Sequence, residues 1–210
     1  MHSYQYEILL TKKEYETISA DFGNEAKRVL QIDFFYDTPE LFLDRPPESS
    51  GNIPMSVKEQ GTTVRIRHRE GVLQGTILQQ QARADLPYPN ETCFTVERLP
   101  LTLDYNGKTL RLCAQLVTER LQITPGAGIE LLLDKNYYYG IVDYELTITY
   151  EKTALYELQM LQERLAVLCG IAPYGRNRWS CGVGAAAPES MCKSDRLFAG
   201  LVEKVNVTVK

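Results

Sequence analysis

The sequence predicts an α+β fold built on antiparallel strands, and three features of its 210 residues lead to this prediction. Many short segments alternate apolar and polar side chains, as strands with one buried face do. Helical patterns are few, and they do not alternate regularly with strands as in βαβ units. If such a sheet closes into a wide barrel, charged inner faces can survive because the barrel encloses water and ligand.

The amino-terminal part is predicted to be a strand followed by a capped helix and a second strand. Residues 4–10 alternate weakly, and Thr11 with Glu14 three residues later is a helix start that Gly23 can end. Residues 31–36 are rich in aromatic and β-branched side chains, and Asp37-Thr38-Pro39 breaks this strand.

The middle of the chain contains the clearest hairpin, with strands at 62–69 and 72–79 around Glu70-Gly71. Before it, residues 45–52 have the composition of an exposed loop. Further strands are predicted at 92–98, 128–134 and 142–150, with a turn at Asn106-Gly107 and a short helix at 109–116.

The carboxyl-terminal part begins with the best helical pattern, which Thr153 is predicted to cap and Gly170 to end. Its apolar stripe consists of Leu155, Leu158, Leu161, Leu165 and Leu168. We expect one domain over residues 1–184 and an extension over 185–210, with a short helix near 195–204.

Composition excludes several partner classes. The net charge of -4 and the pI of about 5.4 argue against general binding to nucleic acid or anionic membranes, which needs a surplus of Lys and Arg. No apolar stretch approaches the roughly 20 residues that span a bilayer. The five scattered cysteines contain no C-x-x-C pair and fit reduced thiols, so we expect a cytoplasmic protein.

Two predicted strands carry opposite charges. Side chains alternate along a strand, so Arg65, Arg67 and Arg69 share one face, and Asp143 and Glu145 share a face of another strand. Neighbouring arginines repel one another unless an anion lies between them, and carboxylates can hold a metal that bridges to that anion. These strands therefore predict a small anionic ligand.

Five segments form an ordered set over roughly residues 4–180. They are Leu9-Leu10-Thr11-Lys12-Lys13-Glu14-Tyr15, Phe35-Tyr36-Asp37-Thr38-Pro39, Arg65-Ile66-Arg67, Thr118-Glu119-Arg120, and Leu133-Asp134 with Asp143-Tyr144-Glu145-Leu146. In this order they resemble the CYTH superfamily, the triphosphate tunnel metalloenzymes.

The resemblance implies an antiparallel eight-stranded β-tunnel, closed or nearly closed, with helices packed outside. Members bind a triphosphate through basic side chains and Mg²⁺ or Mn²⁺ through acidic ones; they hydrolyse inorganic or thiamine triphosphate, and some cyclise ATP. Phosphoryl transfer needs such charge neutralisation and metal. The implied phosphate ligands are Arg65, Arg67, Arg120, Arg178 and Lys58, and the implied metal ligands are Glu145, Glu7 and Asp143.

The sequence departs from the family in both the metal-binding and the phosphate-binding residues. The E-x-E-x-K signature of the first strand reads Ser3-x-Gln5-x-Glu7, Thr147 replaces a second glutamate on the last strand, and Gln79 stands where a phosphate-binding lysine is expected. Loss of a single charge-stabilising group typically costs about 100- to 1,000-fold in rate. Weak or altered activity is therefore expected.

Alternatives remain open. The protein is a metal-dependent phosphohydrolase, or an inactive relative that binds an anionic ligand or a protein partner; adenylate cyclase activity is a third hypothesis. Asp143 and Glu145 either hold metal or pair with arginines, and Arg120 either contacts the anion or forms a salt bridge with a neighbouring strand. Arg69, next to a turn, is expected at the surface.

Overall fold

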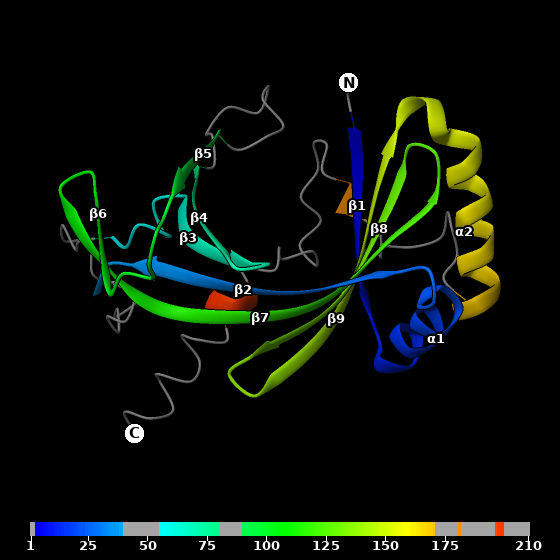
Figure 1. Cartoon of the computed structure of the whole chain (residues 1–210), viewed down its shortest axis with the longest axis horizontal. Coiled ribbons are helices and arrows are strands. Elements are labelled where there is room, and N and C mark those ends of the chain that lie inside the picture. Colours follow the sequence, from blue (N-terminus) through cyan, green and yellow to red (C-terminus); the bar gives the residue numbers. More distant parts are fainter. Residues whose placement is uncertain (1–2, 40–54, 80–89, 171–179, 182–195, 200–210) are drawn as a thin grey trace, which may run out of the picture. The chain divides into compact units, whose positions relative to one another are not determined.

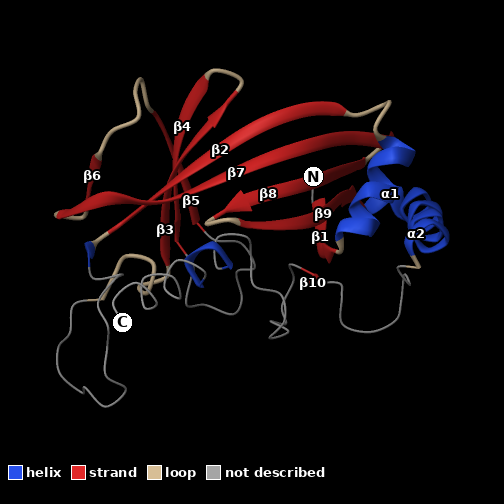
Figure 2. Ribbon diagram, turned by 90° about the horizontal axis from the view of Figure 1, so that it is seen from below, coloured by secondary structure: helices blue, strands red, loops and turns tan. Residues whose placement is uncertain are grey.

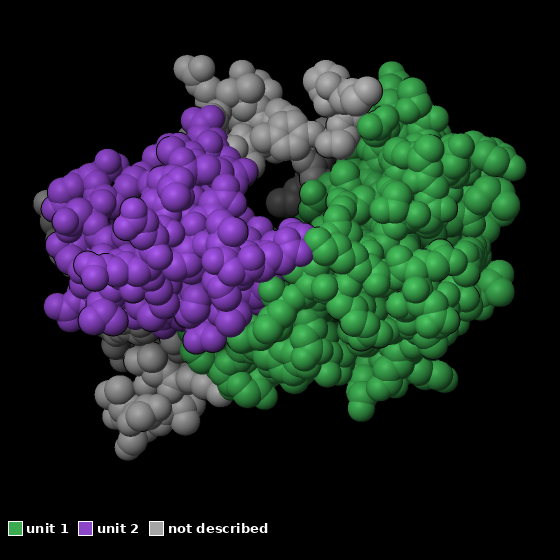
Figure 3. Space-filling model, viewed as in Figure 1, with its two compact units in different colours: residues 1–30, 117–190 green, residues 31–116, 191–210 purple. Residues whose placement is uncertain are grey.

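The computed structural model describes residues 3–39, 55–79, 90–170, 180–181 and 196–199, whose strands and helices are shown in Figure 1 and Figure 2. They belong to two compact units: unit 1 comprises residues 1–30 and 117–190, and unit 2 comprises residues 31–116 and 191–210 (Figure 3). Two long strands, β2 (Lys27–Asp37) and β7 (Lys108–Gly126), contribute residues to both units.

Unit 1 contains an antiparallel sheet in the order β10-β1-β9-β8-β7. Besides its part of β7, the strands are β1 (Ser3–Leu10), β8 (Ile129–Tyr138), β9 (Ile141–Glu151) and β10 (Ser180–Cys181). Two helices pack on it, α1 (Lys12–Phe22) and α2 (Leu155–Cys169), the latter preceded by the 3-10 turn η2 (Lys152–Ala154). Figure 1 shows α2 running alongside β8 and β9. Neither helix has the length and apolar character needed to cross a membrane.

The core of unit 1 lies between one sheet face and these helices. Ile8, Leu131, Leu133, Leu146 and Ile148 occupy alternate positions of their strands, share one sheet face and are buried. From the helices, the core includes Ile18, Phe22, Leu158, Leu161 and Leu165. The opposite face of the same strands carries mostly polar side chains.

The ends of both helices follow the sequence closely, with one exception. Thr11 caps α1, and a capping box joins it to Glu14. Gly170 ends α2 with a φ of 67°, a conformation that glycine adopts without steric cost. Thr153 is not the cap of α2 as predicted, because it lies inside η2 and Ala154 occupies the cap position without a side-chain hydrogen bond.

Unit 2 contains four antiparallel strands in the order β2-β3-β4-β5, and β6 pairs with β7. The new strands are β3 (Thr62–Arg69), β4 (Val72–Gln79), β5 (Asn90–Thr95) and β6 (Thr102–Tyr105). Positive φ angles at Glu70 and Gly71 make the tight β3–β4 turn, as the sequence predicts. The core contains Tyr36, Val57, Val64, Ile66 and Leu110.

The structure corrects two further predictions. Residues 109–116 are not a helix but part of β7, which pairs with β6 through the turn at Asn106-Gly107. The described residues form ten strands rather than eight, since the short β6 and β10 add to the longer ones. The α+β class and the antiparallel pairing are confirmed, whereas closure into a tunnel stays a prediction.

Near the carboxyl end, residues 196–199 are helical, within the range predicted for a short helix. Leu197 and Phe198 are buried, and the Phe198 ring lies edge-on to that of Phe35 at 5.7 Å. The predicted loop at 45–52 lies outside the described residues.

Candidate functional site

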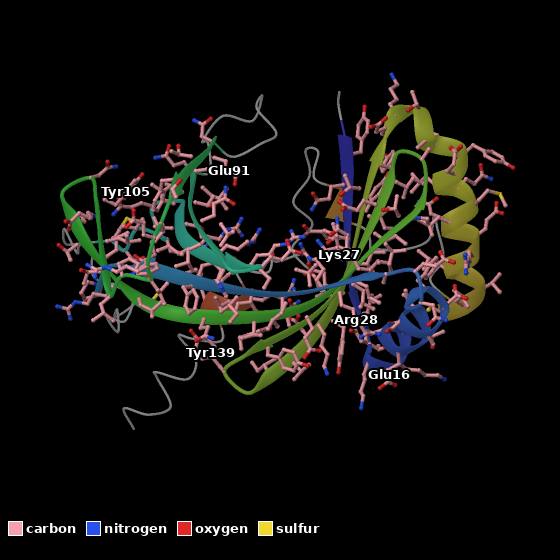
Figure 4. The ribbon with its side chains drawn as sticks, viewed as in Figure 1. Glu16, Lys27, Arg28, Glu91, Tyr105 and Tyr139 are labelled. Atoms are coloured by element: carbon pink, nitrogen blue, oxygen red, sulfur yellow. The ribbon has the colours of Figure 1, made fainter. Side chains whose placement is uncertain are left out.

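Unit 2 has a polar face opposite its core. The register places Arg67 opposite Asp33, Arg65 opposite Thr76, and Thr76 opposite Cys93, so one row crosses β3, β4 and β5. We call this surface the arginine face. Its members are Gln31, Asp33, Phe35, Thr63, Arg65, Arg67, Arg69, Val72, Gln74, Thr76, Leu78, Glu91, Cys93 and Thr95. Glu91 on β5 is labelled in Figure 4.

Arg67 is neutralised by a carboxylate of the neighbouring strand. Its Nε donates to Asp33 Oδ1 at 2.8 Å and its Nη2 donates to Oδ2 at 3.3 Å. Gln31 Nε2 also donates to Asp33 Oδ2 at 2.7 Å, and the Asp33 side chain is 2% exposed. Such partners offset the free-energy cost of burying a carboxylate.

Arg65 has no such compensation. It forms no hydrogen bond or ion pair with the described residues, and its Nε is buried without an acceptor. Burial, and then the neighbouring charge of Arg67, lower the pKa of the Arg65 guanidinium, whereas Asp33 and Glu91 act in the opposite direction. The arginine face therefore contains a cation that lacks an anionic partner of its own.

Lys58 lies beside the arginine face. Its Nζ donates to Thr63 Oγ1 at 3.1 Å and lies 5.4 Å from the centre of the Phe198 ring. Its backbone N–H donates to Asp37, a buried carboxylate that also accepts the N–H of Val57. The segment before β3 is thus fixed by the end of β2.

Unit 1 has a polar face of different composition, which we call the carboxylate face. Four strands meet in one row, Leu9 opposite Glu145, Glu145 opposite Asp134, and Asp134 opposite Arg120. Its members are Gln5, Glu7, Leu9, Thr118, Arg120, Gln122, Glu130, Leu132, Asp134, Asn136, Asp143, Glu145, Thr147 and Thr149.

Arg120 forms the salt bridge that was one of its two expected roles. Its Nε and Nη2 each donate to a different oxygen of Asp134, both at 2.7 Å. The Arg120 side chain is 14% exposed and that of Asp134 is 0% exposed. This two-point pair fixes the guanidinium in the plane of the carboxylate.

The predicted metal ligands share the carboxylate face, and two of them, Asp143 and Glu7, already accept hydrogen bonds from protein donors. Asp143 accepts from Asn136 Nδ2 at 2.8 Å and from the Tyr138 hydroxyl at 2.7 Å, and Glu7 accepts from Gln5 Nε2 at 2.7 Å. Among the described residues no three His, Cys, Asp or Glu side chains converge on one point. The described carboxylates therefore form no preassembled three-ligand site for Mg²⁺ or Mn²⁺, ions that oxygen atoms coordinate.

The predicted site residues are divided between the two units. Arg65, Arg67 and Lys58 belong to unit 2, whereas Arg120 and the three carboxylates belong to unit 1. Arg178 lies outside the described residues.

Sequence reasoning did not single out Asp33, which decides which arginine is compensated. A signal was present, because Asp33 is the only charged residue within the segment Gln31-Ile32-Asp33-Phe34-Phe35-Tyr36. An acidic residue inside a strand that is mostly buried needs a partner. Asn136 was missed as well, although it joins Thr118 to Asp143 through two side-chain hydrogen bonds.

No family model and no curated protein matches the sequence. Solved structures do resemble the chain. A Bacillus halodurans protein provisionally described as an adenylate cyclase has a TM-score of 0.54 and 18% identity over 84% of this chain and 96% of its own. The Hippeastrum protein HpAC1, described as an adenylyl cyclase candidate with a dominant triphosphatase activity, has a TM-score of 0.53 and 14% identity over 85% of this chain and 93% of its own. The antiparallel sheets and these two likenesses show that the chain has a CYTH-type fold.

Proposed function

We propose that this protein binds a triphosphate or a related phosphorylated anion through the arginine face, with Arg65 as the central contact. One observation carries the proposal: the Arg65 Nε is buried and has no acceptor among the described residues. A buried donor without a partner costs about 1–3 kcal/mol, and more when it is charged. A phosphate oxygen removes this cost, because ligand binding gives the Arg65 Nε–H the acceptor that it lacks.

The surroundings of Arg65 favour an anion over a neutral ligand. Three arginines and Lys58 lie on or beside this face, against the carboxylates of Asp33 and Glu91. The hydroxyl of Thr76, opposite Arg65, is a further donor for a phosphate oxygen. A guanidinium donates two parallel hydrogen bonds to a phosphate, which gives direction as well as charge.

Triphosphate is the first ligand to test because HpAC1, which shares the fold, is described as having triphosphatase activity. We expect binding with little turnover in this chain. The signature positions read Ser3, Gln5 and Glu7, so the paired glutamates and the lysine of the family are missing. Arg120 is left out of our ligand set because Asp134 engages it at two points.

Thermal shift with sodium triphosphate tests the proposal in wild-type protein and in Arg65→Met, which keeps much of the side-chain volume and removes the charge. Removing a charge-assisted contact of about 1.5–3 kcal/mol should weaken binding about 10- to 100-fold. Without ligand, the variant should be at least as stable as wild type, because a buried unpaired charge is gone.

The matched control is Arg111→Met, which removes the same charge from an exposed position of β7 and should bind triphosphate like wild type. Absence of stabilisation by triphosphate, pyrophosphate and phosphate in wild type would sink the proposal. Equal responses of wild type and Arg65→Met would exclude Arg65 as the contact. Phosphate release is measured in parallel, because it tests hydrolysis independently of binding.

A further inference from the structure

The carboxylate face of unit 1 carries its own positive charge. Arg120 donates to both oxygens of Asp134, and this carboxylate lies opposite Glu145 in the register. Asp134 is 0% exposed and Glu145 is 4% exposed. Two buried carboxylates on adjacent strands require a nearby cation, and the guanidinium of Arg120 supplies one.

The neighbouring carboxylates are turned toward neutral donors. Asn136 bridges β7 and β9, since its Oδ1 accepts from the Thr118 hydroxyl and its Nδ2 donates to Asp143. The Tyr138 hydroxyl donates to the other oxygen of Asp143. Both oxygens of this carboxylate are therefore used within the protein.

The same pattern continues at the other end of the face. Gln5 Nε2 donates to Glu7, and Gln122 Nε2 donates to Glu130. In each case an amide on the same face provides the donor. A hydrated divalent cation competes with such donors for the carboxylate oxygens, and Mg²⁺ itself loses water reluctantly.

We propose that Arg120 serves the carboxylate face as an internal cation in place of a divalent metal, and that anion binding at the arginine face needs neither Mg²⁺ nor Mn²⁺. The part that concerns the carboxylate face depends only on unit 1. The part that concerns the anion rests on the proposed function. Arg120 is a positioning residue in this proposal, because it holds Asp134, which lies opposite Glu145.

Direct metal binding is measured by electron paramagnetic resonance of Mn²⁺, whose six-line signal disappears when the ion is bound. With wild-type protein in excess, the signal of free Mn²⁺ should be unchanged from that of buffer. Stoichiometric loss of the signal would overturn the proposal.

The role of Arg120 is tested by Arg120→Ala, with Arg120→Lys to restore the charge. Without the guanidinium, Asp134 loses its two-point cationic partner while Glu145 stays opposite it, so we expect a lower Tm that Mn²⁺ raises by about 2 °C or more. Arg120→Lys should regain wild-type insensitivity to Mn²⁺. Arg164→Ala is the matched control, since Arg164 forms a half-exposed pair with Asp21 in the same unit. A folded Arg120→Ala protein whose Tm does not change with Mn²⁺ would refute this role. If the variant does not fold, the Mn²⁺ titration of wild type decides whether the carboxylate face binds metal.

The anion is tested by thermal shift with triphosphate in EDTA and in Mg²⁺. We expect stabilisation in EDTA at least as large as in Mg²⁺. Stabilisation that requires Mg²⁺ would refute metal-independent binding while leaving the proposed function intact. Absence of stabilisation in both conditions would instead refute the proposed function, and the Mn²⁺ titration would still decide whether the carboxylate face binds metal.

Discussion

Asp33 faces Arg67 across β2 and β3 and leaves Arg65, two residues earlier on β3, without a carboxylate partner of its own among the described residues. Asp33 therefore sets how much positive charge the arginine face offers to a ligand. Asp33→Asn should raise the affinity for triphosphate about tenfold, because it releases Arg67 and removes a repulsive charge. The same change should lower the free energy of unfolding by about 1 kcal/mol, since Arg67 loses a charged partner.

Calorimetric titration and urea unfolding measure these two effects. Asp104→Asn removes the same charge from β6, where Asp104 accepts only from Thr109 among the described side chains, and should change the affinity little. Weaker triphosphate binding by Asp33→Asn would contradict the assigned role of Asp33.

Cys93 should report ligand binding through its reactivity. It is exposed and lies in the same cross-strand row as Arg65 and Thr76. Triphosphate on the arginine face should slow alkylation of Cys93 by iodoacetamide severalfold, because the ligand covers the thiol and repels the reactive thiolate. Cys113 should react slowly with or without ligand, since burial raises the pKa of its thiol to about 12.

Peptide mass spectrometry after timed alkylation follows each cysteine separately. In Arg65→Met, triphosphate should no longer protect Cys93. Protection that persists undiminished in this variant would place the ligand elsewhere.

Asp37 joins the end of β2 to the segment before β3. Its Oδ1 accepts the N–H of Thr38 and of Val57, both at 2.7 Å, and its Oδ2 accepts that of Lys58 at 3.0 Å. Asp37→Asn replaces one acceptor by an NH₂ group and leaves an N–H without its partner, so it should destabilise the protein by about 1–3 kcal/mol.

The pH dependence of this effect has a definite sign. Burial raises the pKa of Asp37 in the folded protein, although the three backbone N–H groups act against it. The folded state thus binds a proton more tightly than the unfolded state, and the contribution of Asp37 to stability grows as the pH falls through the raised pKa toward the ordinary value of 3.8. Urea unfolding at several pH values between 7 and 4 should show that the free energy of unfolding of wild type increasingly exceeds that of Asp37→Asn as the pH falls. A difference that shrinks as the pH falls would contradict this.

Gly75 of β4 leaves room for the ring of Phe94, its partner on β5. A Cβ at Gly75 would overlap that ring, so Gly75→Ala should cost about 1–3 kcal/mol through overpacking. In a Phe94→Ala background the cost should largely vanish. A double-mutant cycle by denaturant unfolding measures this coupling, and additive effects would show that the ring does not determine the requirement for glycine.

Local signals predicted the parts of the fold that depend on neighbours in the sequence. The Glu70-Gly71 turn fixed the β3–β4 hairpin, and Thr11 with Glu14 fixed the start of α1. The prediction of a helix at residues 109–116 was wrong because their short apolar pattern is compatible with both the helix and the strand period. The hairpin with β6 makes this segment a strand.

The candidate site was predictable only in its composition. The shared face of Arg65 and Arg67 follows from alternation along one strand. Which arginine is neutralised depends on the register with β2, and this register is a long-range property that places Arg67, not Arg65, opposite Asp33. In the same way, the pairing of β7 with β8 brings Asp134 to Arg120.

Because β1 pairs with β9, the first strand of the chain is synthesised long before its partner strand. β1 is bonded along its length to β9, from Ser3 opposite Glu151 to Leu10 opposite Tyr144. A ribosome therefore releases β1 long before it makes the strand that covers it, while the β3–β4 hairpin can close as soon as both strands emerge. Non-local pairing of this kind slows folding and leaves a strand edge open to other chains. The nascent protein should thus depend most on chaperones during the interval between its first and ninth strands.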